Sequence, residues 1–102
     1  MPLEILSVAI WEPLPGMEAA SLTTIRELIA ILSAKGYSRD LLYHGGDSQY
    51  VHLRYWKSED ERRAAQEDPE VQRCWAKLGH EIQILKVYEQ LEEVPLEVSK
   101  AR

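Results

Sequence analysis

The chain has 102 residues, of which 45% are hydrophobic and 28% are charged, which is enough for one folded domain and argues against disorder. Seventeen acidic residues against twelve basic ones give a net charge of −5, which disfavours nucleic acid and anionic membranes as partners, because both are polyanions. The single cysteine excludes an internal disulfide, and the sequence has no Cys/His cluster that would bind a metal.

No feature of the sequence predicts a membrane or secreted protein. No apolar run approaches the roughly 20 residues that span a bilayer, and residues 1–4 lack the basic start of a signal peptide. We therefore expect one cytoplasmic domain over residues 1–102, with a core in 4–91 and a mostly polar tail in 92–102.

The first predicted strand covers residues 4–12 and ends at a Pro-Leu-Pro-Gly breaker. Both of its faces are largely apolar, which is typical of a central strand in a sheet that is covered on both sides. Alternation assigns the side chains to two faces, Ile5, Ser7, Ala9 and Trp11 on one and Leu6, Val8 and Ile10 on the other.

Residues 17–35 form the clearest predicted helix. Gly36 follows where a left-handed C-terminal cap is favoured. The apolar side chains recur at helical spacing, and they are Leu22, Ile25, Leu28, Ile29 and Leu32.

A hairpin is predicted next, from strands at 39–44 and 49–57 joined by a Gly-Gly-Asp-Ser turn. Alternation again separates two faces of the second strand, Tyr50, His52, Arg54 and Trp56 on one and Val51, Leu53 and Tyr55 on the other.

Two short helices and a last strand follow. Ser58 begins a capping box with Glu61 for a charged helix that runs through Gln66. Asp68 and the proline after it start a second helix. Its apolar stripe consists of Val71, Cys74, Trp75 and Leu78, and Gly79 ends it before a strand at 82–91. With no second cysteine nearby, Cys74 is expected to be a buried structural residue.

The predicted order, β-α-β-β-α-β, is the ferredoxin-like α+β pattern, with helices on one face of an antiparallel sheet. The first and third strands should be central and the strand at 39–44 an edge. A chain of this length buries only about two-thirds of its surface, and the second sheet face would meet water, at residues such as Trp11, Trp56, Tyr88 or their opposite-parity neighbours. We therefore expect a homodimer that packs sheet against sheet.

One segment of the sequence resembles a known family. Residues 55–59, Tyr-Trp-Lys-Ser-Glu, are similar to the strand end of the antibiotic-biosynthesis-monooxygenase family, and the restart at Asp68 and the later Trp75 resemble its second helical region. The resemblance covers roughly residues 4–91. It implies a dimeric α+β barrel and cofactor-free oxidation of a small phenolic or quinol substrate, without metal or flavin.

His52 and Arg54 are the candidate catalytic residues, because they place polar chemistry on an otherwise aromatic strand face. An imidazole can transfer a proton near neutral pH, and a guanidinium can hold an anionic oxygen. The structural alternative is more common: an interface pair, hydrogen-bonded across a dimer or to Glu89 or Glu12, since arginine and aromatic residues are enriched at interfaces.

A substrate pocket between helices and sheet would be lined by aromatic side chains and a hydroxyl. In the alternative interpretation the same aromatic residues fill the core in place of phenylalanine, which is absent. The candidates for substrate binding are Ser7, Trp11, Trp56, Trp75 and Tyr88. The sequence thus leaves open a cofactor-independent monooxygenase, a non-catalytic dimeric binding or assembly domain, or another reaction in the same barrel.

Overall fold

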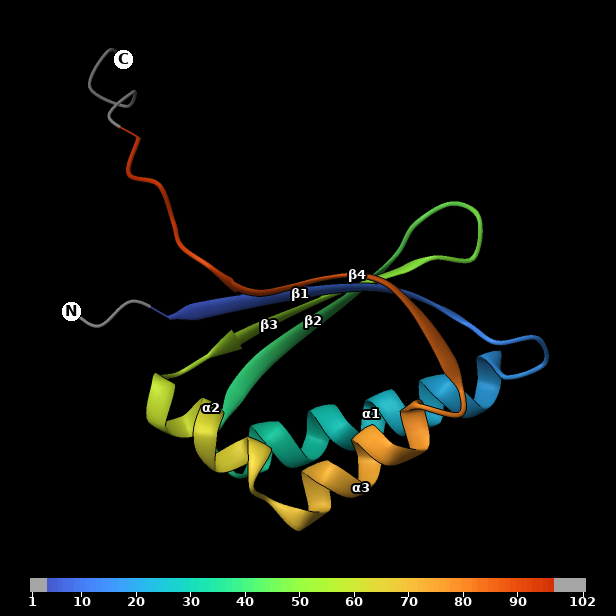
Figure 1. Ribbon diagram of the computed structural model, residues 1–102, viewed down its shortest axis with the longest axis horizontal. Coiled ribbons are helices and arrows are strands. Elements are labelled where there is room, and N and C mark those ends of the chain that lie inside the picture. Colours follow the sequence, from blue (N-terminus) through green and yellow to red (C-terminus); the bar gives the residue numbers. More distant parts are fainter. Residues whose placement is uncertain (1–3, 97–102) are drawn as a thin grey trace.

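The computed structural model describes residues 4–96, which form one antiparallel sheet of four strands and three helices (Figure 1). The predicted tail 92–102 is therefore described only as far as residue 96, and residues 1–3 lie outside the described part. The elements in chain order are β1 (Ile5–Pro13), α1 (Glu18–Ala34), β2 (Ser38–His44), β3 (Tyr50–Trp56), α2 (Glu59–Gln66), α3 (Pro69–Leu78) and β4 (Ile82–Leu91).

The strand order is β2-β3-β1-β4, so the prediction of central first and third strands and an edge strand after the first helix is confirmed. All neighbours are antiparallel. In the register, Val8 of β1 lies opposite Leu53 of β3, and Leu53 lies opposite Leu41 of β2. Two register shifts interrupt the pairing of β1 with β4.

All three helices cover the same face of the sheet, and the other face is open (Figure 1). Trp11 and Trp56 lie on the helix side and are 1% and 3% exposed. The expectation that these two tryptophans would meet water is therefore wrong, and the opposite-parity alternative holds for β1 and β3. Tyr88, in contrast, pairs with Val8 and is 44% exposed.

The core lies between the helices and the covered sheet face. It joins Trp11 and Trp56 to the inward stripes of α1 and α3. Cys74 on α3 is 1% exposed, and its burial raises the pKa of its thiol. The prediction of a buried structural cysteine is confirmed.

Local sequence signals explain where the helices end. Gly36 follows α1 with φ of +74°, a left-handed conformation that side chains disfavour. At the start of α2 the Ser58 hydroxyl accepts a hydrogen bond from the Glu61 amide at 3.1 Å. The predicted return bond from the Glu61 side chain is absent from the hydrogen bonds of the described residues.

Asp68 joins three segments. Its carboxylate caps α3 by accepting the Glu70 amide at 2.9 Å, and it also accepts bonds from Lys35 Nζ at 2.7 Å and the Tyr37 hydroxyl at 2.8 Å. These hydrogen bonds lower the pKa of the Asp68 carboxyl to about 2, and the bond from Lys35 contributes most. The end of α1 and the start of β2 are thereby tied to α3.

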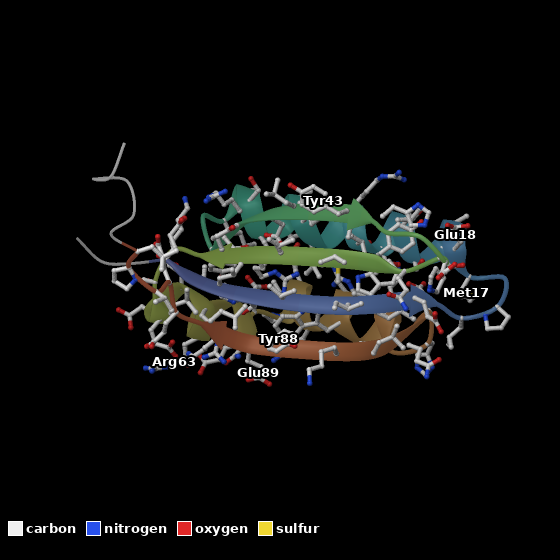
Figure 2. The ribbon with its side chains drawn as sticks, turned by 90° about the horizontal axis from the view of Figure 1, so that it is seen from above. Met17, Glu18, Tyr43, Arg63, Tyr88 and Glu89 are labelled. Carbon is white, nitrogen blue, oxygen red and sulfur yellow. The ribbon has the colours of Figure 1, made fainter. Side chains whose placement is uncertain are left out.

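The open face of the sheet is apolar (Figure 2). Tyr43 and Leu41 on β2 are 56% and 42% exposed. The chain after β4 runs away from the helices on the open side (Figure 1), with Val94 and Leu96 exposed. An apolar surface of this extent is typical of an interface.

Candidate functional site

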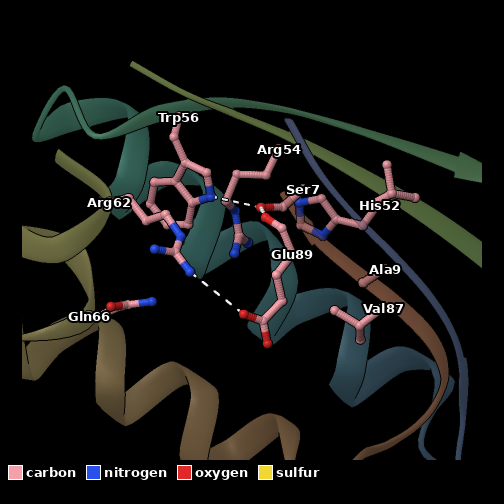
Figure 3. Close-up of a pocket in the computed structure, with 10 residues that line it drawn as sticks. Ser7, Ala9, His52, Arg54, Trp56, Arg62, Gln66, Val87 and Glu89 are labelled. Atoms are coloured by element: carbon pink, nitrogen blue, oxygen red, sulfur yellow. Dashed lines mark hydrogen bonds and ion pairs between the residues drawn. The ribbon is translucent and has the colours of Figure 1, made fainter. Parts of the chain in front are cut away.

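A cavity of about 210 Å³ lies between the covered sheet face and α2 (Figure 3). Two larger hollows, of about 470 and 490 Å³, lie at the two ends of β1, one beside the end of β4 and the other beside the start of α1. Of these three, only the first cavity is lined by polar side chains from three strands, β1, β3 and β4, and from α2. Its lining residues are Ser7, Val8, Ala9, His52, Arg54, Trp56, Arg62, Gln66, Val87 and Glu89.

Four of the seven predicted site residues line this cavity: Ser7, His52, Arg54 and Trp56. The remaining three lie elsewhere. Trp11 is in the core, stacked on Tyr50 with ring centroids 4.6 Å apart. Trp75 is half-buried on α3 and packs against the core, and Tyr88 lies on the open face.

His52 and Arg54 share a partner that the sequence analysis missed. Asp40 on β2 accepts a hydrogen bond from Arg54 Nε at 2.7 Å, and the same oxygen lies 2.6 Å from His52 Nε2. Its other oxygen accepts a bond from the Ser38 hydroxyl at 2.8 Å. The anticipated partners Glu89 and Glu12 do not bond to either residue. The observed register pairs Asp40 with Arg54, whereas the predicted strand limits, with residue 44 opposite residue 49, would have placed Asp40 opposite Leu53.

The Asp40 carboxylate is ionised despite its burial. Burial alone raises the pKa of the carboxyl, but the bonds and charges of His52 and Arg54 together outweigh it, so the pKa lies below its usual value. A negative charge therefore lies directly behind the two side chains that face the cavity.

A second chain of hydrogen bonds closes one wall of the cavity (Figure 3). The Trp56 indole donates to the Ser7 hydroxyl at 2.9 Å, and Ser7 donates to the backbone carbonyl of Glu89 at 2.6 Å. The one donor of Ser7 and the one donor of Trp56 are thus both used within the protein. Ser7 keeps one acceptor position for a ligand hydroxyl.

Arg62 and Gln66, one turn apart on α2, face the cavity from the helix side. Arg62 bonds to Glu59 at 3.1 Å and lies 3.6 Å from the Glu89 carboxylate across the opening (Figure 3). Both were missed because the charged composition of α2 indicated an exposed helix. The available signal was their i, i+4 spacing, which places both side chains on one face of the helix that follows β3.

The described residues contain no group of three or more His, Cys, Asp or Glu side chains that could hold a metal ion. No helix within residues 4–96 combines the length and apolarity needed to cross a membrane.

Solved structures with the same fold are known. No family model and no curated protein matches the sequence. The chain is similar to SnoaB, a cofactor-independent oxygenase from Streptomyces nogalater, with a TM-score of 0.73 and 18% identity over 92% of this chain and 99% of that one.

Two further structures agree. A putative antibiotic biosynthesis monooxygenase from Chloroflexus aurantiacus gives a TM-score of 0.73 at 14% identity, covering 93% of this chain and 98% of that one. A conserved protein of unknown function from Bacteroides thetaiotaomicron, a possible oxidoreductase, gives 0.74 at 8% identity, covering 87% and 99%. The chain therefore has the ferredoxin-like α+β fold of the antibiotic biosynthesis monooxygenases, as the resemblance implied.

Proposed function

We propose that this protein is a cofactor-independent monooxygenase that acts on a small phenol or quinol. The observation that carries the proposal is the cavity with an oriented imidazole and a guanidinium, His52 and Arg54, in a fold shared with a cofactor-independent oxygenase. The cavity is smaller than the roughly 300 Å³ at which most ligand pockets begin. It therefore suits a single aromatic ring better than a fused polycycle.

The proposed reaction needs no external reductant. His52 accepts the proton of a ring hydroxyl, and the resulting oxyanion is held by Arg54. The electron-rich ring then reacts with dioxygen, of which one atom enters the ring and the other leaves as water. The substrate supplies the electrons and both hydrogens of that water, and a phenol ends as a quinone.

We also propose that the protein acts as a homodimer in which the open sheet faces pack together. The apolar character of that face supports this arrangement, because a monomer would leave Leu41, Tyr43 and Tyr88 in water. The segment after β4, residues 92–96, extends away from the helices on the side of the open face (Figure 1). Its exposed Val94 and Leu96 offer further apolar surface to a partner copy.

The test of the catalytic proposal is oxygen consumption with a panel of hydroquinones and phenols of one to three rings. We expect uptake with single-ring members and a loss of about 100-fold or more in His52→Gln, since general-base groups contribute at least that much. His80→Gln serves as control, because His80 is exposed outside the cavity. The folded dimer failing to consume oxygen with every member would contradict the proposal.

The alternative is a non-catalytic dimeric binding or assembly domain. The observation that favours it is that Trp56, Ser7 and Asp40 already satisfy one another or their neighbours, which leaves few polar groups free for a substrate. Ligand binding without oxygen uptake would support this alternative.

A further inference from the structure

Asp40 is a buried charge that lines none of the three cavities described above. Its side chain is 1% exposed and lies on the covered face of the edge strand β2, behind His52 and Arg54. An ionised carboxylate in such a place carries a desolvation cost that only good hydrogen bonds offset. Asp40 has three: one to each of Ser38, His52 and Arg54.

The contact with Asp40 determines which nitrogen of His52 carries the proton. An ionised carboxylate can only accept hydrogen bonds, so the His52 nitrogen 2.6 Å from it, Nε2, must be the protonated one. In the neutral ring Nδ1 then holds the free lone pair.

His52 Nδ1 faces the cavity. The imidazole is 6% exposed and lines the cavity, yet Nδ1 has no hydrogen bond among the described residues. It is also not one of the polar atoms that are both fully enclosed and unpaired, which are Trp11 Nε1 and Glu81 Oε1. Since Nε2 is occupied by Asp40, Nδ1 is the atom of the ring that a ligand can reach.

The same carboxylate orients Arg54. It binds the guanidinium through Nε at 2.7 Å, and this leaves the two terminal nitrogens without a hydrogen-bond partner in the described part of the chain. The guanidinium also lies 5.3 Å from the Trp56 ring centroid. A donor group held at its inner end and free at its outer end is suited to bind an oxyanion.

We infer that Asp40 is a positioning residue that sets His52 as a proton acceptor through Nδ1 and aims the terminal nitrogens of Arg54 at the same cavity. This role rests on the proposed function of the cavity, but the protonated nitrogen of His52 can be measured independently of any activity. Asp40 touches no ligand itself and acts only through the two side chains that it holds.

The test is the tautomer of His52, measured by two-bond proton–nitrogen NMR correlation of the nitrogen-15-labelled full chain. The measurement is made at about pH 9, well above the ordinary imidazole pKa of about 6.5. His52→Gln identifies the signals of this ring among the three histidines. We expect a protonated Nε2 and an unprotonated Nδ1, each with its own nitrogen shift.

Two substitutions at Asp40 distinguish the effect of its acceptor oxygen from the effect of its side-chain size. In Asp40→Ala the acceptor is lost, so the two nitrogen shifts of His52 should move toward each other as the tautomers exchange. In Asp40→Asn the amide oxygen can still accept from His52 and Arg54 while its NH₂ donates to Ser38, so the wild-type shifts should return. Ser38→Ala, which leaves the His52 contact intact, is the matched control.

The inference is overturned if wild-type His52 carries its proton on Nδ1, or if folded Asp40→Ala keeps the wild-type shifts. The wild-type spectrum decides the first point even where a variant does not fold. A fixed tautomer without oxygen uptake would contradict only the proposed function, and oxygen uptake with an exchanging tautomer would contradict only the inference.

Discussion

Two buried aspartates, Asp40 and Asp68, are held in their ionised form by hydrogen bonds from cationic side chains and hydroxyl groups. Asp40 supports the cavity, whereas Asp68 joins α1, β2 and α3. In each case the pKa of the carboxyl lies below its usual value, so each favours the folded state more when it is charged.

Acid should therefore weaken the fold through Asp68. The folded pKa is about 2 and the ordinary value is 3.8, so the stabilisation is complete above about pH 4 and is lost as the pH falls toward 2. We expect the urea midpoint to fall over this interval, and Asp68→Asn to show a smaller fall. The remaining fall includes the contribution of Asp40.

The control for that titration is Asp60→Asn. Asp60 is exposed and makes no hydrogen bond or ion pair with other described residues, so its variant should follow the wild-type curve. An Asp68→Asn protein whose midpoint falls as steeply as that of the wild type would show that Asp68 contributes nothing to acid stability.

For single residues, the sequence predicted which side chains lie at the site better than it predicted which side chains they contact. His52 and Arg54 were identified because a charged pair on an aromatic strand face is unusual. Asp40 was missed because it lies on the neighbouring strand β2, and the pattern within one strand does not show which side chains of the next strand lie beside it. Trp75 was wrongly assigned to the cavity. A helical stripe shows which side of a helix faces inward but not what that side contacts.

Among the elements, the end of α1 depends on one residue. Gly36 has φ of +74°, and a Cβ there would meet nothing closer than Lys57 Nζ at 3.8 Å. The cost of Gly36→Ala should therefore be conformational, about 1–2 kcal/mol of unfolding free energy, measured by urea denaturation.

Gly46→Ala is the matched comparison, because a Cβ at that glycine has no atom within 4 Å and the backbone there is not left-handed. We expect its stability to stay close to that of the wild type. Equal stability of the two variants would mean that the cap at Gly36 is not strained by a side chain.

The elements were predicted almost residue by residue, since their boundaries depend on local signals. Caps at Ser58 and Asp68, the stop at Gly79 and the turn at 45–48 act within a few residues of each boundary. The last strand begins and ends where its composition predicted, at 82 and 91. Such signals need no knowledge of the rest of the chain.

For the whole molecule, the proposed dimer can be broken at one position. Leu53 lies on the open face between Val8 and Leu41 on the neighbouring strands. A charge there, in Leu53→Glu, would be buried without a partner in the dimer but would meet water in the monomer. We expect sedimentation velocity at micromolar concentration to find a wild-type dimer and a monomeric variant.

Ala76→Glu adds the same charge on the exposed side of α3 and should remain dimeric. A wild-type protein that sediments as a monomer would contradict the dimer, and a dimeric Leu53→Glu would place its interface elsewhere. The face that the helices cover could not be predicted, because β1 is apolar on both sides and periodicity alone does not distinguish them.

The buried thiol of Cys74 can be used to measure how often the core around α3 opens. It is the sole thiol in the sequence, and at 1% exposure a water-soluble alkylating reagent can reach it only when α3 leaves the core. Its rate of labelling would then measure how often that happens, on a single atom and without an added probe. No residue of α3 lines the cavity, so a ligand there should slow the labelling only where the thiol is reached by unfolding of the whole domain. In that case the rate should fall by the factor 1 + [L]/Kd, which offers a screen for ligands before any turnover is seen.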